Sequence, residues 1–209
     1  ASDVYKRQNL FLVVDAVSAF LAEPLNLSEL GIDIMLTGSQ KALAVPPGVS
    51  VLVMNKRAVD MAYNLDVKSM YFNLADALKN GERGQTPFTP AVGILLQIHR
   101  RLEELCKAGA IAENKRIADL AADFRKKVKD LPFRMFSPSP SNAVTAMTME
   151  NGKSAYALFE LLESDYGMWI CPNGGDLKDK IFRVGHLGAL TFEDNDRLVE
   201  AMKQALERL

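Results

Sequence analysis

The sequence predicts an α/β protein in which a partial, mostly parallel sheet is followed by a smaller α+β domain. Three long apolar runs without alternation fall within the first 55 residues. Two stretches with helical periodicity follow between residues 91 and 128, and strands then mix with helices to the end of the chain. We place the first domain, with a connecting helix, at residues 9–114 and the second at residues 115–209.

The three apolar runs are interpreted as strands. They are LFLVVD (10–15), IDIMLTGS (32–39) and VSVLVMN (49–55). Because none alternates as a half-buried strand does, we expect a sheet that is covered on both faces. In open parallel sheets ligands gather at the carboxyl ends of the strands, so residues at these ends are candidate site residues.

Two amphipathic helices are predicted next, one on each side of the segment KAGA. In both, apolar residues recur every three or four positions, which is the spacing of one helix face. We interpret these faces as packed against a core and the Lys and Glu residues between them as solvated. The apolar residues are Ala91, Ile94, Leu95, Ile98, Leu102 and Leu105, and then Ile117, Leu120, Ala121, Phe124 and Val128.

The C-terminal region is predicted to contain three strands and two helices. AVTAMTM (143–149) alternates like a half-buried strand, and GMWI (167–170) and KIFRVGHLG (180–188) are the other two. One helix is expected around residues 154–164, and a last helix is expected to begin at Thr191, with Asp194 completing its cap. The residues of that helix expected in the core are Leu198, Met202, Ala205, Leu206 and Leu209.

Composition excludes several classes of function. The 209 residues include 25 Lys and Arg against 26 Asp and Glu, without a basic stripe among aromatic residues, so nucleic acid is not an expected partner. The apolar runs are too short and too interrupted to cross a bilayer. Cys106 and Cys171 show neither a disulfide framework nor zinc spacing, and His99 and His186 are far apart, so no metal site is expected. We expect a soluble protein of the reducing cytoplasm.

The first residues do not resemble a natural start. Residues 1–8, ASDVYKRQ, contain no Met and run without a turn signal into the first predicted strand. We interpret them as a non-native leader. The chain is then expected to be a truncated protein whose N-terminal half is missing.

Asp15 and Lys41 are the residues that suggest a chemistry. Asp15 ends the first predicted strand, and Lys41 follows the second. A carboxylate can keep a pyridine nitrogen protonated and a lysine amine can carry an aldehyde, so the pair suits pyridoxal phosphate. The apolar residues of KALAVPPG favour the uncharged amine, and its prolines fix the backbone. The residue pattern alone leaves two alternatives open: Asp15 could be a turn or helix-cap residue, and Lys41 could be an ordinary surface lysine.

Three motifs in order add a resemblance to a family. VVDAVSAF, IDIMLTGSQKALAVPPG and FRVGHLG resemble the class V aminotransferases of fold type I, and the likeness covers residues 9–209. Within the family, the sequence most resembles the alanine–glyoxylate and serine–pyruvate transaminases. The resemblance implies that the chain is the C-terminal part of such an enzyme, with pyridoxal 5′-phosphate as cofactor and small amino acids and 2-oxo acids as substrates.

The resemblance also implies residue roles. Asp15 corresponds to the partner of the pyridinium nitrogen, Val17 to the residue packed on one ring face, and Gln40 to a neighbour of the phosphate or ring oxygen. Lys41 corresponds to the Schiff-base lysine, which also moves the proton of the substrate Cα. Arg183 corresponds to the arginine that binds the substrate α-carboxylate, for which a bidentate guanidinium is suited.

The segment GQTPFTP (84–90) resembles the one that reaches the cofactor phosphate of the neighbouring subunit in a homodimer. Thr86 and Thr89 are its candidate donors, and an ordinary turn before a helix is the alternative. His186, near Arg183, is interpreted as a packing or supporting residue. The phosphate cradle and the aromatic residue that stacks on the ring are expected in the absent half.

Other functions stay open within this reading. A 2-aminoethylphosphonate transaminase has the same fold, although Arg183 favours a substrate with an α-carboxylate. A cysteine desulfurase also shares it, but WICPNGG does not resemble the loop of its reactive cysteine, so Cys171 is interpreted as a small buried apolar residue. A non-catalytic fragment that only associates with a partner is the alternative from another class.

Overall fold

The computed structural model describes residue 8 and residues 10–150 and 152–209. It divides into two compact units, the first made of residues 1–20 and 25–107 and the second of residues 21–24 and 108–209. The expected boundary between residues 114 and 115 falls inside the helix α5 (Ala110–Lys127). The proposed leader at residues 1–8 lies, apart from Gln8, outside the described residues.

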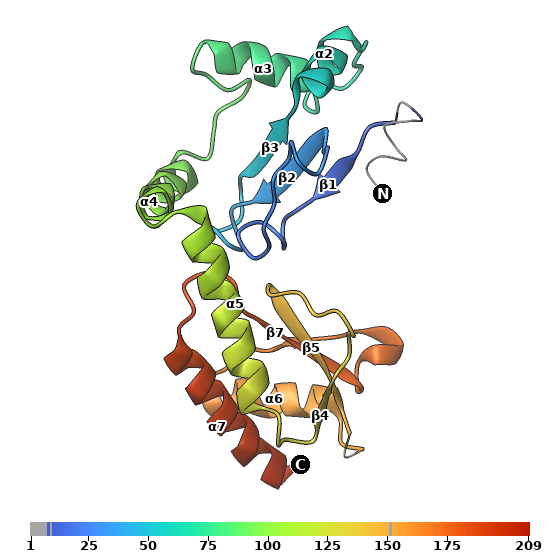
Figure 1. Ribbon diagram of the computed structural model, residues 1–209, viewed down its shortest axis with the longest axis vertical. Helices are drawn as coiled ribbons and strands as arrows, with labels where there is room; N and C mark the ends of the chain where they lie inside the picture. The colour runs from blue at the N-terminus through green and yellow to red at the C-terminus, as the bar shows by residue number, and fades with distance from the viewer. Residues whose placement is uncertain (1–7, 9, 151) are drawn as a thin grey trace. The chain divides into compact units, whose positions relative to one another are not determined.

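The sheet of the first unit has the strand order β1-β2-β3, with β1 (Val13–Asp15), β2 (Ile34–Gly38) and β3 (Ser50–Met54) (Figure 1). β1 and β2 are parallel, with Asp15 opposite Leu36. β2 and β3 are antiparallel, so β3 is the exception in a sheet that we expected to be mostly parallel. The connection at residues 39–49 contains no helix, and a parallel return requires a crossover that is usually helical.

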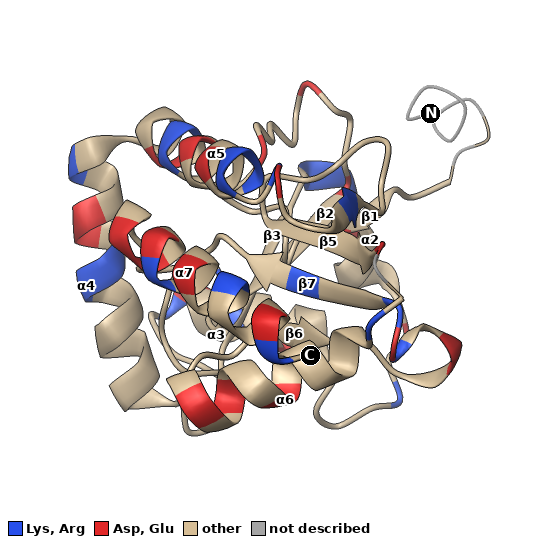
Figure 2. Cartoon of the chain, turned by 90° about the horizontal axis from the view of Figure 1, so that it is seen from below, with Lys and Arg blue, Asp and Glu red and all other residues tan. Residues whose placement is uncertain are grey.

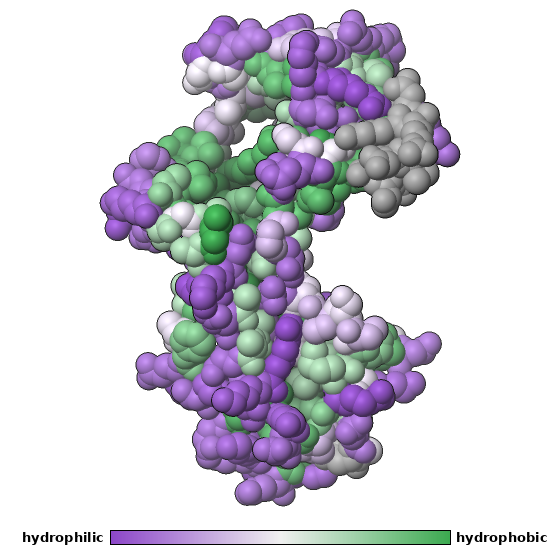
Figure 3. All heavy atoms as spheres, viewed as in Figure 1, coloured by the Kyte–Doolittle hydropathy of each residue, from purple (hydrophilic) through white to green (hydrophobic). Residues whose placement is uncertain are grey.

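The burial of these strands also differs from the prediction. Val13 is 54% exposed, Leu52 42% and Val53 45%, whereas the apolar runs predicted cover on both faces. Apolar side chains therefore reach the surface of this unit (Figure 3). An apolar run indicates which surroundings a strand suits, but its actual burial depends on which elements cover it, and the described helices of this unit leave these side chains exposed.

Three helices follow in the first unit: α2 (Lys56–Asn64), α3 (Leu74–Glu82) and α4 (Val92–Ala108). α4 is the first helix predicted from periodicity, and Ile98 and Leu105 of its apolar stripe are buried. α2 and α3 were not predicted. Each begins after an asparagine whose side chain accepts a backbone N–H, Asn55 from Ala58 and Asn73 from Asp76.

The second unit has an antiparallel sheet with the strand order β4-β5-β7-β6. The strands are β4 (Phe133–Met135), β5 (Val144–Met149), β6 (Cys171–Pro172) and β7 (Ile181–Gly185), and a short 3₁₀ helix, η1 (Gly175–Leu177), precedes β7. β5 and β7 match two of the predicted strands. The prediction of a strand at 167–170 is wrong. Gly167 has a φ of 62°, and the N–H groups of Gly167 and Met168 donate back to α6 (Ala155–Tyr166), so these residues end that helix.

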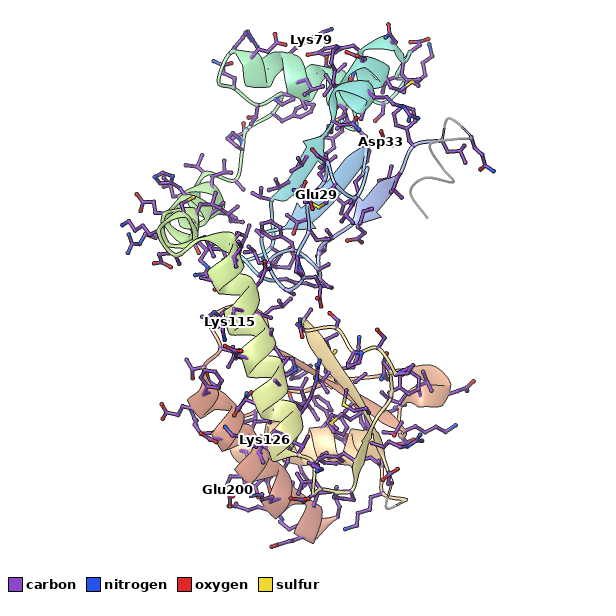
Figure 4. The ribbon with its side chains drawn as sticks, in the orientation of Figure 1. Glu29, Asp33, Lys79, Lys115, Lys126 and Glu200 are labelled. Carbon is purple, nitrogen blue, oxygen red and sulfur yellow. The ribbon has the colours of Figure 1, made fainter. Side chains whose placement is uncertain are left out.

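Helices α5 (Ala110–Lys127), α6 and α7 (Phe192–Arg208) complete this unit. All five apolar residues predicted for α5 are buried. The capping box of Thr191 and Asp194 is present at the start of α7; Met202 and Ala205 are buried, and Leu198, Leu206 and Leu209 pack half-buried on the same core. Charged residues are frequent along α5 and α7 (Figure 2), among them the exposed Lys115, Lys126 and Glu200 (Figure 4).

Candidate active site

Asp15 and Lys41 lie at the carboxyl ends of two adjacent parallel strands. Asp15 is the last residue of β1, and Lys41 follows Gly38, the last residue of β2. The backbone continues this pairing one step further, since Ala16 N–H donates to the Leu36 carbonyl at 2.9 Å. Asp15 Oδ1 accepts from Val17 N–H at 2.9 Å, which fixes the turn after β1. The carboxylate and the amine are both exposed, as groups that receive a ligand must be.

The Lys41 amine has a partner that the sequence did not indicate. Its Nζ donates to Ser18 Oγ at 2.5 Å. Ser18 lies in the turn after β1, so this hydrogen bond joins the segments that follow β1 and β2. Nothing in the residue pattern distinguishes Ser18 from an ordinary loop serine.

Ser39 is a second residue that sequence reasoning missed. It has no exposed surface, and its Oγ donates to the Pro46 carbonyl at 2.7 Å and accepts from Val49 N–H at 3.4 Å. Its N–H also donates to the Val49 carbonyl at 3.0 Å. These bonds close the loop that carries Lys41. That a serine near Lys41 is completely buried is visible only in the folded chain.

Gln40 and Val17 flank the two charged groups. Val17 is half-buried, and Gln40 is exposed. A Cβ built on Gly38 would lie 2.4 Å from Gln40 Oε1, so the missing side chain of Gly38 leaves the space in which the Gln40 amide lies. Glycine is therefore required at the end of β2 for this orientation of Gln40.

Thr86 and Thr89 line an open hollow of about 870 Å³ formed by residues 84–90 and Leu95. The Thr86 hydroxyl donates to the Phe88 carbonyl at 2.5 Å, so in this structure its proton is already engaged. Thr89 is exposed.

Arg183 belongs to the second unit, on β7, opposite Ala146 of β5 and Cys171 of β6. Its Nη2 donates to the Pro172 carbonyl at 3.1 Å. Its Nε is buried and has no hydrogen-bond partner in the structure. A buried donor without a partner is unfavourable, so this guanidinium is suited to take up an acceptor such as a carboxylate.

His186 lies three residues after Arg183 and is almost completely buried. Its Nε2 is 2.8 Å from Thr145 Oγ1, which in turn accepts from Arg125 Nε at 2.9 Å. The Thr145 hydroxyl therefore joins the His186 ring to the Arg125 guanidinium. Burial, and next the charge of Arg125, lower the pKa of His186 from 6.5 to about 4. The ring supports the sheet beside Arg183.

One expectation about the cysteines is wrong. Cys171 is exposed, because its position at the start of the short edge strand β6 leaves it uncovered, whereas we expected a buried residue. In the part of the chain that the structure describes, no group of three or more His, Cys, Asp and Glu side chains could hold a metal ion. None of the described helices is long and apolar enough to span a bilayer.

The residues present fit pyridoxal phosphate and an amino acid substrate. An exposed amine and an exposed carboxylate follow neighbouring parallel strands, which suits an aldehyde with a basic ring nitrogen. The unpartnered Nε of Arg183 suits a carboxylate. The fit rests on the chemistry of these donors and acceptors.

Comparison with known proteins agrees with the predicted fold. The crystal structure of ureidoglycine–glyoxylate aminotransferase from Bacillus subtilis superimposes with a TM-score of 0.90 at 24% identity, over 99% of this chain and 55% of that one. The predicted fold class, the C-terminal part of a fold type I aminotransferase, is confirmed.

Two curated relatives are longer than the part of them that this chain matches. An uncharacterized aminotransferase of Helicobacter pylori strain J99 is 31% identical over 96% of this chain and 53% of its own length. Alanine–glyoxylate aminotransferase of Rattus norvegicus is 27% identical over 96% of this chain and 51% of its own length. The chain therefore spans about half the length of the curated relatives it matches.

A family model described as aminotransferase class-V matches residues 2–170, most of the chain. The resemblance drawn from the three motifs is thereby confirmed. The chain belongs to the class V aminotransferase family.

Proposed function

We propose that the protein containing this chain is a pyridoxal-phosphate-dependent transaminase. It moves an amino group from a small amino acid, alanine or serine, to a 2-oxo acid such as glyoxylate or pyruvate. The observation that carries the proposal is the placement of the Asp15 carboxylate and the Lys41 amine after two adjacent parallel strands. Family membership and the name of the rat relative support the same reaction.

Each residue at the ends of β1 and β2 has a proposed task. Pyridoxal phosphate, when bound, supplies a ring that withdraws electrons from the Cα of an attached amino acid. Asp15 holds the proton at the ring nitrogen, and Lys41 carries the aldehyde carbon and moves the proton at the substrate Cα. Val17 packs on the ring, and Gln40 binds near the phosphate or ring oxygen.

Arg183 is proposed to bind the substrate α-carboxylate. Its free Nε and its remaining guanidinium N–H groups supply the paired donors that a carboxylate accepts. A lysine at this position would supply charge without the planar fork, and the Cα–H bond would lose its fixed orientation.

The protein is further proposed to be a homodimer in which Thr86 and Thr89 reach the cofactor phosphate of the neighbouring subunit. The Thr86 hydroxyl must then exchange its bond to Phe88 for one to the phosphate. Tyr71 stacks on Phe88 at 5.1 Å while both stay exposed, and an exposed aromatic cluster beside this segment supports a contact surface. Both cysteines are free thiols, which supports the proposed cytoplasmic location.

The test is amino-group transfer by the protein at the length of its relatives, loaded with pyridoxal phosphate. Glyoxylate is supplied with alanine, serine, 2-aminoethylphosphonate or cysteine in turn. We expect glycine to form with alanine or serine. Arg183→Lys should raise the KM for these donors by about tenfold or more, whereas Arg134→Lys, at an exposed arginine of the same sheet, should leave it unchanged.

Other outcomes select the alternatives. Transfer from 2-aminoethylphosphonate alone would identify the phosphonate transaminase. Release of sulfide from cysteine in the presence of an added thiol reductant, lost in Cys171→Ser, would identify the desulfurase. Absence of transfer from every donor would contradict the proposed enzyme and leave a chain that only associates.

A further inference from the structure

The contact between Lys41 and Ser18 joins the two loops that carry the proposed chemistry. Lys41 Nζ and Ser18 Oγ are 2.5 Å apart, within one compact unit of the chain. A serine hydroxyl both donates and accepts, so it can keep this contact with a protonated or a neutral amine.

The loop that carries Ser18 is held at several points. Ala16 is completely buried, and its N–H donates to the Leu36 carbonyl at 2.9 Å. Its own carbonyl accepts from Phe20 N–H at 2.8 Å, which closes a turn around Ser18. Asp15 Oδ1 holds Val17 N–H at 2.9 Å. The Ser18 hydroxyl therefore starts from a fixed backbone.

The backbone of Lys41 is fixed from the other side. Ala42 and Leu43, which follow it, are 1% and 3% exposed, and the Lys41 carbonyl accepts from Ala44 N–H at 2.9 Å. Ser39 closes the same loop through Pro46 and Val49. The backbone of Lys41 is therefore fixed, and only its flexible four-carbon side chain remains to be held in one conformation.

We propose that Ser18 is a positioning residue for Lys41: its hydroxyl holds the amine in place while the amine is not bonded to a carbonyl carbon. The inference rests on the proposed function, in which Lys41 combines with the aldehyde of pyridoxal phosphate. A lysine stem carries much rotamer entropy, so an exposed amine without a partner spends most of its time elsewhere. When the neutral amine donates an N–H to Ser18 Oγ, its lone pair stays free to add to the carbonyl.

The role of Ser18 can be tested through the reaction of the Lys41 amine with the aldehyde of pyridoxal phosphate, followed by reduction with borohydride. The Nζ lone pair forms a bond to the aldehyde carbon, and the carbonyl oxygen leaves as water. Borohydride then delivers a hydride to that carbon and leaves a stable secondary amine. The modified lysine is located by peptide mass spectrometry.

The experiment compares the rates of modification of Lys41 by pyridoxal phosphate and borohydride in four forms of the protein at the length of its relatives: the wild type, Ser18→Ala, Ser18→Thr and Ser28→Ala. Ser28 is an exposed serine of the same unit and serves as the matched control. Lys79, an exposed lysine of α3 (Figure 4), gives an internal reference rate in every sample. A net hydrogen bond corresponds to a change of about fivefold.

We expect Ser18→Ala to slow modification of Lys41 about fivefold relative to Lys79, and Ser18→Thr to stay within about twofold of the wild type. Ser28→Ala should match the wild type. Modification of Lys41 at equal rates in the wild type and Ser18→Ala would overturn the role of Ser18. A threonine variant as slow as the alanine variant would also overturn it, since the hydroxyl would then not be the cause. A wild-type chain in which Lys41 is not modified faster than Lys79 would count against the proposed function itself.

Discussion

His186 should make the stability of the second unit depend on pH. The ring is 1% exposed and shares a hydrogen bond with Thr145, and burial lowers its pKa from 6.5 to about 4. The unfolded chain therefore takes up a proton below pH 6.5, while the folded chain does so only near pH 4. Stability is complete above pH 6.5 and is lost as the pH falls through this window.

The size of the loss follows from the shift. Each unit of pKa difference corresponds to about 1.4 kcal/mol, so the free energy of unfolding should fall by about 3 kcal/mol once the pH is below 4. At pH 4.5 most of the titration is complete, so most of this loss should already be present. Domains are commonly stable by only about 5–15 kcal/mol, so a loss of this size is readily measured.

The assay is urea unfolding at pH 7.5 and 4.5, followed by fluorescence of Trp169. This residue is the chain's single tryptophan, and it packs edge-on against Phe159 at 4.7 Å in the second unit. His186→Gln can still form a hydrogen bond with Thr145 but does not titrate, so its loss between these pH values should be smaller than that of the wild type by about 2–3 kcal/mol. His99→Gln, at an exposed histidine of α4, should behave as the wild type. Equal losses in the wild type and His186→Gln would refute the reasoning.

Two further predictions concern local structure. Thr191→Ala removes the side-chain half of the capping box of α7 and should lower the free energy of unfolding of the second unit by about 1 kcal/mol in the same assay. Thr191 N–H and hydroxyl hold the pKa of Asp194 below its usual value, so this pKa should rise in the variant when measured by NMR, and an unchanged value would contradict the box. Gly48→Ala should destabilise the first unit by about 1–3 kcal/mol, because Gly48 has a φ of 146° and a Cβ would lie 2.4 Å from Ile94 Cδ1. Gly81→Ala, where a Cβ meets nothing within 4 Å, is the control, and equal hydrogen-exchange protection in the two variants would show that Gly48 is not required.

The elements with strong periodicity could be predicted from the sequence, and weaker ones could not. The stripe of α5 and the cap of α7 were found because spacing and capping chemistry are local. α2 and α3 were not predicted because their apolar stripes are short. The two capping asparagines are the only local signals of these helices. The direction of β3 depends on how the loop at 39–49 closes through Ser39, which is a tertiary property.

The candidate site divides in the same way. Asp15 and Lys41 stand out because each follows an apolar strand, so their positions at strand ends could be predicted. Ser18 and Ser39 are ordinary small polar residues in the sequence, and their relation to Lys41 exists only after the loops have packed. Cys171 was predicted to be buried because WICPNGG does not resemble the loop of a reactive cysteine, whereas its exposure follows from its place on an edge strand.

The most direct test is to identify the lysine that pyridoxal phosphate occupies in the protein at the length of its relatives. The loaded protein is reduced with borohydride, digested and mapped by mass spectrometry, for the wild type and for Asp15→Asn. We expect the label on Lys41 in both, with cofactor binding weakened in the Asp15 variant because the ring nitrogen loses its anionic partner. A label on any other lysine of the wild type would contradict the assignment of this site.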